Sequence, residues 1–251
     1  ALTPGTVLVS IMAANNETGV LQPITELAAV AHARGVLFHT DAAQAAGKIP
    51  IDARAWDVDL LTIAGHKMYA PKGVGAVYVR SGVRLEPLVY GGGQERGLRA
   101  GTENIVLAVG LGAAAHLAYA DLEAGGADRI RTLRDLLHHK LDELLPGRIQ
   151  LNGHHDRRLP NTLNVSITGA VGDDLLAATP GIAAATGSAC HTGSPEPSPV
   201  LLAMGHDPGR ALSALRLTLG RWTTRDDIGH AAHQIAAGVQ AADRTRSLPL
   251  S

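Results

Sequence analysis

Residue types suited to chemistry follow three apolar runs of the chain. HTDAAQ places Asp41 and Gln44 directly after one run, AGHKMYAPKG places His66 and Lys67 after another, and Asn16 follows a third. In open α/β sheets, ligands bind outside the carboxyl ends of the strands. An amine, a carboxylate and an imidazole gathered there can hold a cofactor and move protons.

A fourth polar segment, TGSACHTGSPEPS (residues 186–198), carries Cys190, the single cysteine of the chain. Free cysteines are usually buried among apolar residues, whereas this one stands among Gly, Ser, Thr and Pro. A thiolate on such a loop can act as a nucleophile and carry a group outward. The setting therefore favours a catalytic cysteine over a structural one.

Taken singly, these residues also have ordinary structural roles. Asn16 can belong to a turn, Asp41 can cap the next helix, and His66 can be a satisfied, partly buried histidine. Together, a lysine, an aspartate and glycine-rich turns form the set that pyridoxal 5′-phosphate requires. The lysine forms a Schiff base with the cofactor, and the aspartate keeps its pyridine nitrogen protonated.

The segment GGGQERGLRAGTEN (residues 91–104) is a glycine-rich loop that leads into a helix starting near Asn104. It is either a surface loop or, because helix N-termini attract anions, part of a phosphate site.

The elements that must position these groups alternate between strands and helices. Strands are predicted at residues 6–12, 36–42, 58–65 and 74–80, with a helix from Ile24 to Gly35. A helical block from Asn104 to about Leu145 breaks at residues 124–128; strands at 162–168 and 215–220 and a long helix from Thr224 follow. This order predicts an α/β fold, with a mainly parallel sheet flanked by helices and a smaller C-terminal α+β domain.

Composition excludes several classes of protein. Lys and Arg number 22 against 23 Asp and Glu, so no basic footprint for nucleic acid is present. One cysteine excludes a disulfide framework and suits a reducing cytoplasm. The apolar run at residues 105–115 stops at His116, so we expect a buried helix and no membrane segment, and the N-terminus does not resemble a signal peptide.

The motifs quoted above resemble those of the cysteine desulfurases, pyridoxal phosphate enzymes of fold-type I. The similarity runs in order over nearly the whole chain, through SIMAANNETGVLQPI, HTDAAQAAGKIPID, GHKMYAPKGVGAVYVR, GGGQERGLRAGTEN, GSACHTGSPEPSPVLLAMG and LRLTLGRWT. The Cys190 segment is similar to the long-loop class. The resemblance implies a homodimer with a cofactor-binding large domain and a small domain that carries the cysteine loop. The break in the helical block near residue 125 is the candidate boundary between them, which gives residues 1–125 and 126–251.

The resemblance also implies a role for each matching residue. Lys67 would hold the cofactor and move protons at the substrate α-carbon, Asp41 would pair with the pyridinium nitrogen, and Arg216 would clamp the carboxylate of L-cysteine. The other expected cofactor contacts are Asn16 and Gln44 near the phenolic oxygen, Ala64, Gly65 and His66 near the phosphate, and Thr102 at the phosphate of the second subunit's cofactor. Asn16 would also lie beside the substrate carboxylate.

Cys190 would attack the sulfur of the bound cysteine, leaving alanine and a persulfide. The sulfur would pass to an acceptor, such as an iron–sulfur scaffold protein, or into tRNA thiolation, and the persulfide of Cys190 would be the contact to an iron–sulfur cluster. Two alternatives are an inactive remnant that serves as sulfur relay or scaffold, and a selenocysteine lyase.

Two features depart from the family pattern. Ala64 stands where the family usually has a serine whose hydroxyl bonds the phosphate. Loss of this hydrogen bond should weaken cofactor binding by about 1.5–3 kcal/mol. We also expect that the chain lacks the N-terminal portion of the family, with its Gly-Thr phosphate loop and the histidine that stacks on the pyridine ring.

Overall fold

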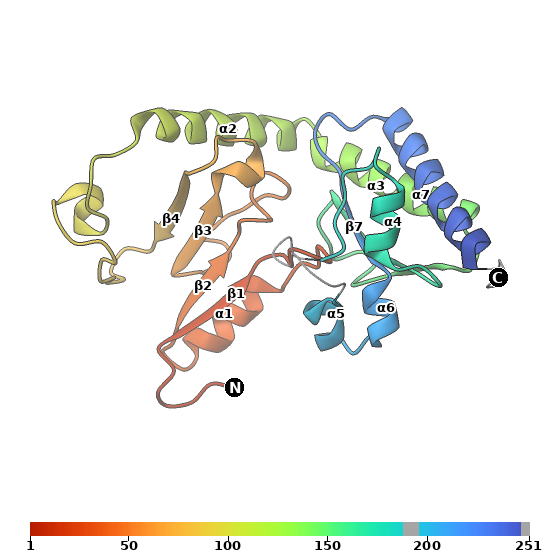
Figure 1. Ribbon diagram of the computed structural model, residues 1–251. Coiled ribbons are helices and arrows are strands. Elements are labelled where there is room, and N and C mark those ends of the chain that lie inside the picture. Colours follow the sequence, from red (N-terminus) through yellow and green to blue (C-terminus); the bar gives the residue numbers. More distant parts are fainter. Residues whose placement is uncertain (188–195, 247–251) are drawn as a thin grey trace. The chain divides into compact units, whose positions relative to one another are not determined.

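The computed structural model describes residues 1–187 and 196–246 (Figure 1). Its contacts divide the chain into two compact units. Unit 1 consists of Ala1–Ala14 and Gln22–Ala124, and unit 2 consists of Asn15–Leu21 and Gly125–Ser251. Each unit has its own sheet and its own core, so each is described by itself.

Unit 1 is built on a four-stranded sheet in the order β1–β2–β3–β4. β1 (Leu8–Met12), β2 (Leu37–Asp41) and β3 (Leu60–Ala64) are parallel, and β4 (Gly75–Val79) runs antiparallel to β3. The predicted mainly parallel sheet is confirmed. β4 reverses because residues 65–74 form a connection too short for the crossover that parallel strands need.

The two faces of this sheet differ in burial. Phe38 and Thr40 of β2 are fully buried on one face, and α1 (Ile24–His32) packs against this strand (Figure 1). His39 and Asp41 alternate with them and therefore lie on the other face. That face also presents large apolar side chains that are exposed, namely Leu8, Met12, Leu37 and Val77.

An ionic cluster fastens the end of α1 to the sheet. His32 Nε2 lies 2.7 Å from Asp59 Oδ2, which also accepts a hydrogen bond from the backbone of Phe38. His32 Nδ1 lies 3.2 Å from Asp57, and Arg80 bridges both carboxylates. The hydrogen bond to Asp59 raises the pKa of His32, against the opposing effect of burial.

A tight turn after β3 carries His66 and Lys67. It is a 3₁₀ helix, η1 (Gly65–Met68), and it ends at Tyr69 in the left-handed conformation. The backbone N–H of Gly65 donates to the Val74 carbonyl at 2.9 Å, which joins the turn to the start of β4. A Cβ on Gly65 would lie 2.8 Å from that same oxygen, so only glycine fits without a backbone shift.

The expectation of a buried helix at residues 105–115 is wrong. α2 (Ile105–Glu123) runs beyond His116, and Ala114 is its only buried residue. Its apolar residues are spread around the helix, so contacts on one side, with η1 and Pro71, leave the rest open. By length and composition alone, α2 is apolar enough to cross a membrane, with mean hydropathy 1.7, but one such helix is weak evidence.

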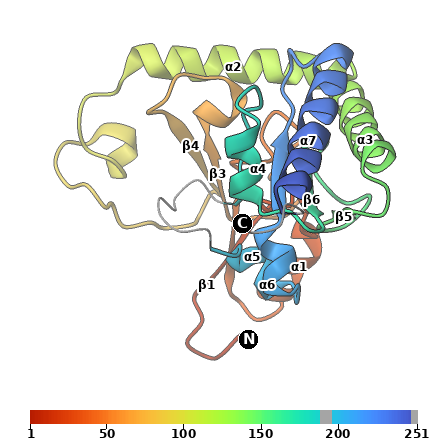
Figure 2. The same ribbon diagram turned by 45° about the vertical axis from the view of Figure 1, so that its right-hand side comes forward.

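Unit 2 is built on an antiparallel sheet in the order β5–β6–β7. β5 (Ile149–Leu151) and β7 (Ala214–Thr218) flank β6 (Thr162–Ile167), and α3 (Gly126–Leu144) and α7 (Arg225–Arg246) supply the helical layer (Figure 2). The core joins apolar residues of α3, β6, β7 and α7. The remaining short helices are η2 (Gln94–Gly97) in unit 1 and α4 (Gly172–Ala178), α5 (Pro199–Ala203) and α6 (Pro208–Leu212) in unit 2.

The second face of β6 is polar and yet buried. Asn152 Nδ2 donates to Asn164 Oδ1 and to Ser166 Oγ, both at 2.8 Å. Arg210 Nε donates to Asn152, and Ser166 donates to the Arg210 carbonyl. Each partner satisfies another, which is the condition for burying such groups. The network also fastens α6 to the sheet.

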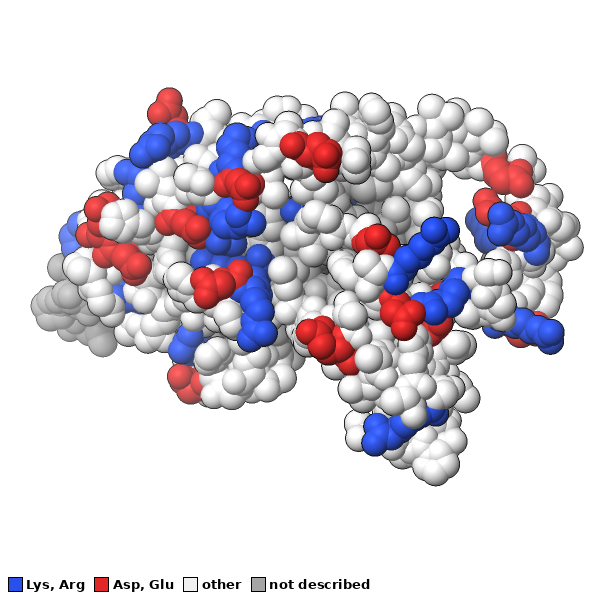
Figure 3. Space-filling view, turned by 180° about the vertical axis from the view of Figure 1, so that it is seen from behind, with Lys and Arg blue, Asp and Glu red and all other residues white. Residues whose placement is uncertain are grey.

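One face of the molecule carries charges of both signs. On the face seen in Figure 3, basic and acidic side chains are interspersed. This distribution agrees with the near-equal counts of the two charge types.

The His32 cluster predicts a pH-dependent contribution to stability. Because folding raises the pKa of His32 above 6.5, its contribution is present below that pH and is lost as the pH rises through the folded-state value. The unsubstituted chain should unfold at a higher temperature than His32→Gln at pH about 6, and this difference in thermal unfolding midpoint should shrink as the pH rises to about 8. The exposed His116→Gln serves as control, and a pH-independent difference between wild type and His32→Gln would contradict the prediction.

Alanine substitutions of Gly65, in the turn after β3, and of Gly112, in α2, should have opposite effects on stability. Gly65→Ala places a methyl group against a backbone oxygen and should lower the free energy of unfolding by about 1–3 kcal/mol. Gly112→Ala, in α2 with open space around the new methyl, should raise it by about 0.5–1 kcal/mol. Urea unfolding followed by circular dichroism measures both changes, and equal stability of the two variants would refute the steric argument.

Candidate cofactor and active site

Asp41 and Thr62 lie side by side at the edge of the unit 1 sheet. They are register partners on the parallel strands β2 and β3, and Met12 of β1 pairs with Asp41 on its other side. Asp41 is exposed, and one carboxylate oxygen accepts a hydrogen bond from the backbone of Ala43 at 2.8 Å. The Asx turn that this bond closes starts the segment on which Gln44 stands, half-buried.

His66 and Lys67 follow β3 directly, on η1, and both are exposed. Because β2 and β3 are parallel neighbours, the turn after β3 begins at the same sheet edge as the end of β2. Unit 1 thus brings Asp41, Gln44, His66 and Lys67 to one edge. Ala64 ends β3 and offers no hydroxyl there.

Sequence reasoning missed His39. Its ring nitrogens lie 2.7 Å from Ser10 Oγ and 3.2 Å from Thr62 Oγ1, so three strands are joined through one imidazole. Burial lowers the pKa of His39, with Asp41 acting in the opposite direction, and this favours a neutral ring. The alternation of β2 puts His39 on the face of Asp41 and was a usable signal in the sequence.

Thr102 lies in the exposed loop before α2. The predicted helix start near Asn104 is confirmed, because the Asn104 side chain caps α2 by accepting a hydrogen bond from the Leu107 backbone at 3.1 Å. Within the loop, Gln94 accepts a hydrogen bond from the backbone of Gly101, and Glu95 and Arg96 adopt positive φ angles. Thr102 is therefore held near a structured helix start.

In unit 2, the structure brings Arg216 and Asn16 together. Arg216 Nη1 donates to the Asn16 carbonyl at 3.0 Å, although the two residues are far apart in sequence. The backbone of Arg216 is fixed on both sides, by Asn164 of β6 and by a bridge to Ala185. The guanidinium is half-buried and still has other donors for a ligand.

Glu17 is a second residue that sequence reasoning missed. It is only 2% exposed, and its carboxylate accepts a hydrogen bond from Ser198 Oγ at 2.5 Å. Its carbonyl accepts one from Asn164 Nδ2, and the Asn15 side chain accepts one from its backbone N–H. Glu17 thus fixes the turn that carries Asn16.

Cys190 lies outside the described residues, so its proposed nucleophilic role and its iron–sulfur contact remain predictions from the sequence. Among the described residues, no group of three or more His, Cys, Asp or Glu side chains is arranged to hold a metal ion.

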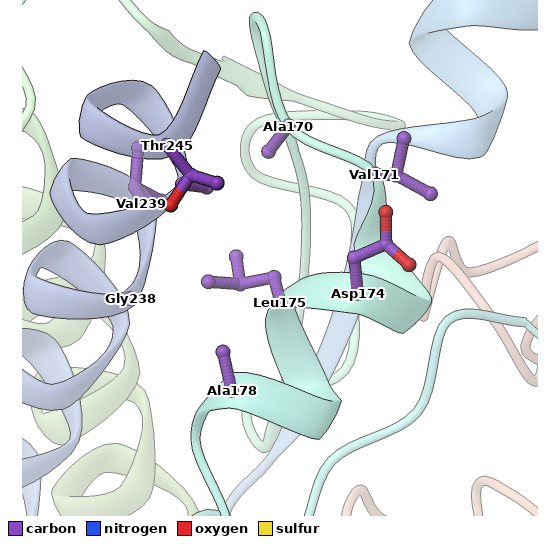
Figure 4. A pocket seen from close by; sticks show the side chains of 9 residues that line it. Ala170, Val171, Asp174, Leu175, Ala178, Gly238, Val239 and Thr245 are labelled. Carbon is purple, nitrogen blue, oxygen red and sulfur yellow. The ribbon is translucent and has the colours of Figure 1, made fainter. Parts of the chain in front are cut away.

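A pocket of about 240 Å³ lies in unit 2 between α4 and α7 (Figure 4). Its lining is mostly small and apolar, with Leu175 and Val239 pointing inward and Asp174 at one side (Figure 4). None of the predicted site residues lines it.

Comparisons with known proteins relate this chain to one protein family. The family model Aminotransferase class-V matches residues 1–230. A cysteine desulfurase of Gluconacetobacter diazotrophicus is 50% identical over 91% of this chain and 57% of its own length. Cysteine desulfurase IscS of Ehrlichia chaffeensis is 45% identical over 96% of this chain and 59% of its own length.

The fold agrees with these relatives. A solved structure of a NifS-like protein has a TM-score of 0.86 and 35% sequence identity, and the similarity covers 96% of this chain and 63% of that one. The chain therefore has the pyridoxal phosphate fold-type I architecture. It spans less than two thirds of the length of the curated relatives named above.

Proteins of this kind depend on pyridoxal 5′-phosphate. The donor set of unit 1 fits that group, because an amine, a carboxylate and an imidazole meet at one sheet edge, and a glycine lets the turn approach closely. Fold, motifs and donor set agree with the family match. The chain belongs to the aminotransferase class-V family.

Proposed function

We propose that this chain carries out cysteine desulfuration with pyridoxal 5′-phosphate, converting L-cysteine to L-alanine and passing the sulfur to an acceptor protein. The observation that carries the proposal is the meeting of Asp41 and the Lys67 turn at the end of two parallel strands. The desulfurase names of the relatives support the choice of reaction.

The residues of unit 1 hold and tune the cofactor, which supplies an electron sink for the substrate α-carbon. Lys67 would hold the cofactor through its amine and would move a proton at the α-carbon. Asp41 keeps a proton on the pyridine nitrogen, and Gln44 donates to the phenolic oxygen. His66 and the backbone of Ala64 and Gly65 would bind the phosphate, without the hydroxyl that a serine at position 64 would add.

The residues of unit 2 act on the substrate. Arg216 binds the cysteine carboxylate through paired N–H donors, and Asn16 lies beside it. The thiolate of Cys190 attacks the substrate sulfur, so an S–S bond forms while the C–S bond breaks. The electron pair of the C–S bond stays with the substrate β-carbon, which takes up one proton, and the α-carbon regains the proton that it lost, so that alanine results. The resulting persulfide on Cys190 is the form in which sulfur leaves.

We further propose a homodimer in the cytoplasm, in which Thr102 reaches the phosphate of the second subunit's cofactor. The segment around Thr102 supports this arrangement, because Leu88 is 98% exposed and Val106 is 80% exposed. Such side chains are typical of a surface that a partner covers. In the same proposal, residues 1–125 form the cofactor-binding domain and residues 126–251 carry the cysteine loop.

The acceptor follows from the chemistry of a persulfide. Its outer sulfur is open to attack by another thiolate, so the acceptor presents a cysteine. An iron–sulfur scaffold protein or a tRNA-thiolation carrier fits this requirement, and the IscS name of one relative favours the former.

Covalent attachment of the cofactor tests the role of Lys67. After incubation with pyridoxal 5′-phosphate and reduction with borohydride, mass spectrometry should find the adduct on Lys67 in the unsubstituted chain and no adduct there in Lys67→Ala. Lys72→Ala, at an exposed lysine on the next turn, should keep it. Absence of the adduct from the unsubstituted chain would contradict the proposed function.

Cys190→Ser separates binding from sulfur transfer. This variant should keep the adduct on Lys67 and lose persulfide formation, because a hydroxyl is a far weaker nucleophile than a thiolate. Sulfide release that continues unchanged in Cys190→Ser under limiting reductant would remove Cys190 from the reaction.

Arg216→Lys tests substrate binding. Replacing a planar fork by a point charge removes one charge-assisted hydrogen bond, which should raise KM for cysteine by about 10- to 100-fold. The Lys67 adduct should stay intact, and Arg225→Lys, at an exposed arginine of α7, is the matched control. An unchanged KM would show that another residue binds the carboxylate.

A further inference from the structure

A second lysine of unit 1 contacts the backbone of Lys67. Lys48 Nζ donates a hydrogen bond to the Lys67 carbonyl at 2.5 Å and another to the Ala46 carbonyl at 3.3 Å. The same ammonium group lies 5.8 Å from the centre of the Tyr69 ring. Lys48 therefore joins the segment after β2 to the C-terminal part of the turn after β3.

The surroundings of Lys48 bring it to this place. Gly47, just before it, has a φ of +70°, and a Cβ there would lie 3.2 Å from Met68 and 3.1 Å from Ala118. The chain therefore passes close to η1 and to α2 at this point.

The partners of this ammonium group are unusual for a half-buried charge. Within residues 1–187 and 196–246, no carboxylate lies within ion-pair distance of Lys48. Burial and the positive charge of Lys67 lower the pKa of Lys48 to about 8. Two carbonyls and an aromatic ring hold a cation that a carboxylate would hold more strongly.

The group of the turn that Lys48 contacts is the Lys67 carbonyl. The last carbonyls of a short helix lack helical partners, and lysine side chains are suited to satisfy them. Within the turn, the Gly65 N–H donates to the Val74 carbonyl and the Ala70 N–H donates to the Gly65 carbonyl. The Lys67 carbonyl, which lies between them in the chain, accepts its hydrogen bond from Lys48.

We propose that Lys48 is a positioning residue for Lys67. The ammonium group of Lys48 fixes the backbone of η1 and so aims the Lys67 amine at the cofactor. This inference rests on the proposed function of Lys67. It adds a residue that contacts neither cofactor nor substrate.

Amide hydrogen exchange over residues 65–70 tests the positioning without any cofactor. At pH about 7, Lys48→Met should raise exchange in this turn by about tenfold, since a hydrogen bond to a charged group is lost. Lys48→Arg should restore protection, and Lys72→Met should leave it unchanged. Unchanged protection in Lys48→Met would overturn the proposal, and so would loss of protection spread evenly over unit 1.

The unsubstituted chain supplies a second readout that needs no variant to fold. Lys67 and Tyr69 on η1 are the titratable groups that contact or repel Lys48, and α2 faces this segment through Ala118. As Lys48 loses its proton near pH 8, protection of the turn, corrected for intrinsic exchange, should fall. In Lys48→Arg it should persist, because arginine stays charged. Constant protection across this range in the unsubstituted chain would overturn the proposal.

Borohydride trapping then links positioning to the cofactor. Lys48→Met should slow formation of the Lys67 adduct by about tenfold, with Lys48→Arg close to wild type. If no adduct forms even in the unsubstituted chain, the proposed function fails while the exchange data still decide the role of Lys48. If the adduct forms equally fast in all variants, Lys48 has no positioning role.

Discussion

The parallel pairing of β2 with β3 is the constraint on which the site depends. It sets Asp41 beside Thr62 and makes the turn after β3 begin where β2 ends. β4 then has to return antiparallel within a short connection, and this forces the close approach of Gly65 to the Val74 carbonyl. The place of Lys67 thus follows from strand order and from one glycine.

Around that edge, unit 1 adds polar contacts to its buried core. His39 joins three strands through Ser10 and Thr62, and the His32 cluster fastens α1 to the opposite face. The face that carries Asp41 leaves large apolar side chains exposed, and α2 is open along most of its surface. Such surfaces are stable in water only at a cost, and they mark where further chain or a partner would contribute.

Unit 2 holds Arg216 and Asn16, the residues proposed to bind the substrate, in a different way. Arg216 and Asn16 come together because a short segment from early in the chain packs with the small sheet. Glu17, Asn164 and Ser198 fix that segment through buried hydrogen bonds. Buried polar groups of this kind are costly when unpaired, so their complete pairing keeps the segment in one conformation.

The sequence by itself determined most of the elements and the family, and it named the candidate site residues. Strand and helix periods placed β1 to β4, α1, α3 and α7, and the motifs singled out Asp41, Lys67 and Arg216, because local pattern and residue type are written in the chain. It did not determine that α2 is exposed, since an all-round apolar helix reads the same whether or not neighbours cover it. Nor did it reveal Lys48, Glu17 or His39, which look like ordinary polar residues. Only the tertiary structure shows their contacts, because each depends on partners that are distant in sequence and close in space.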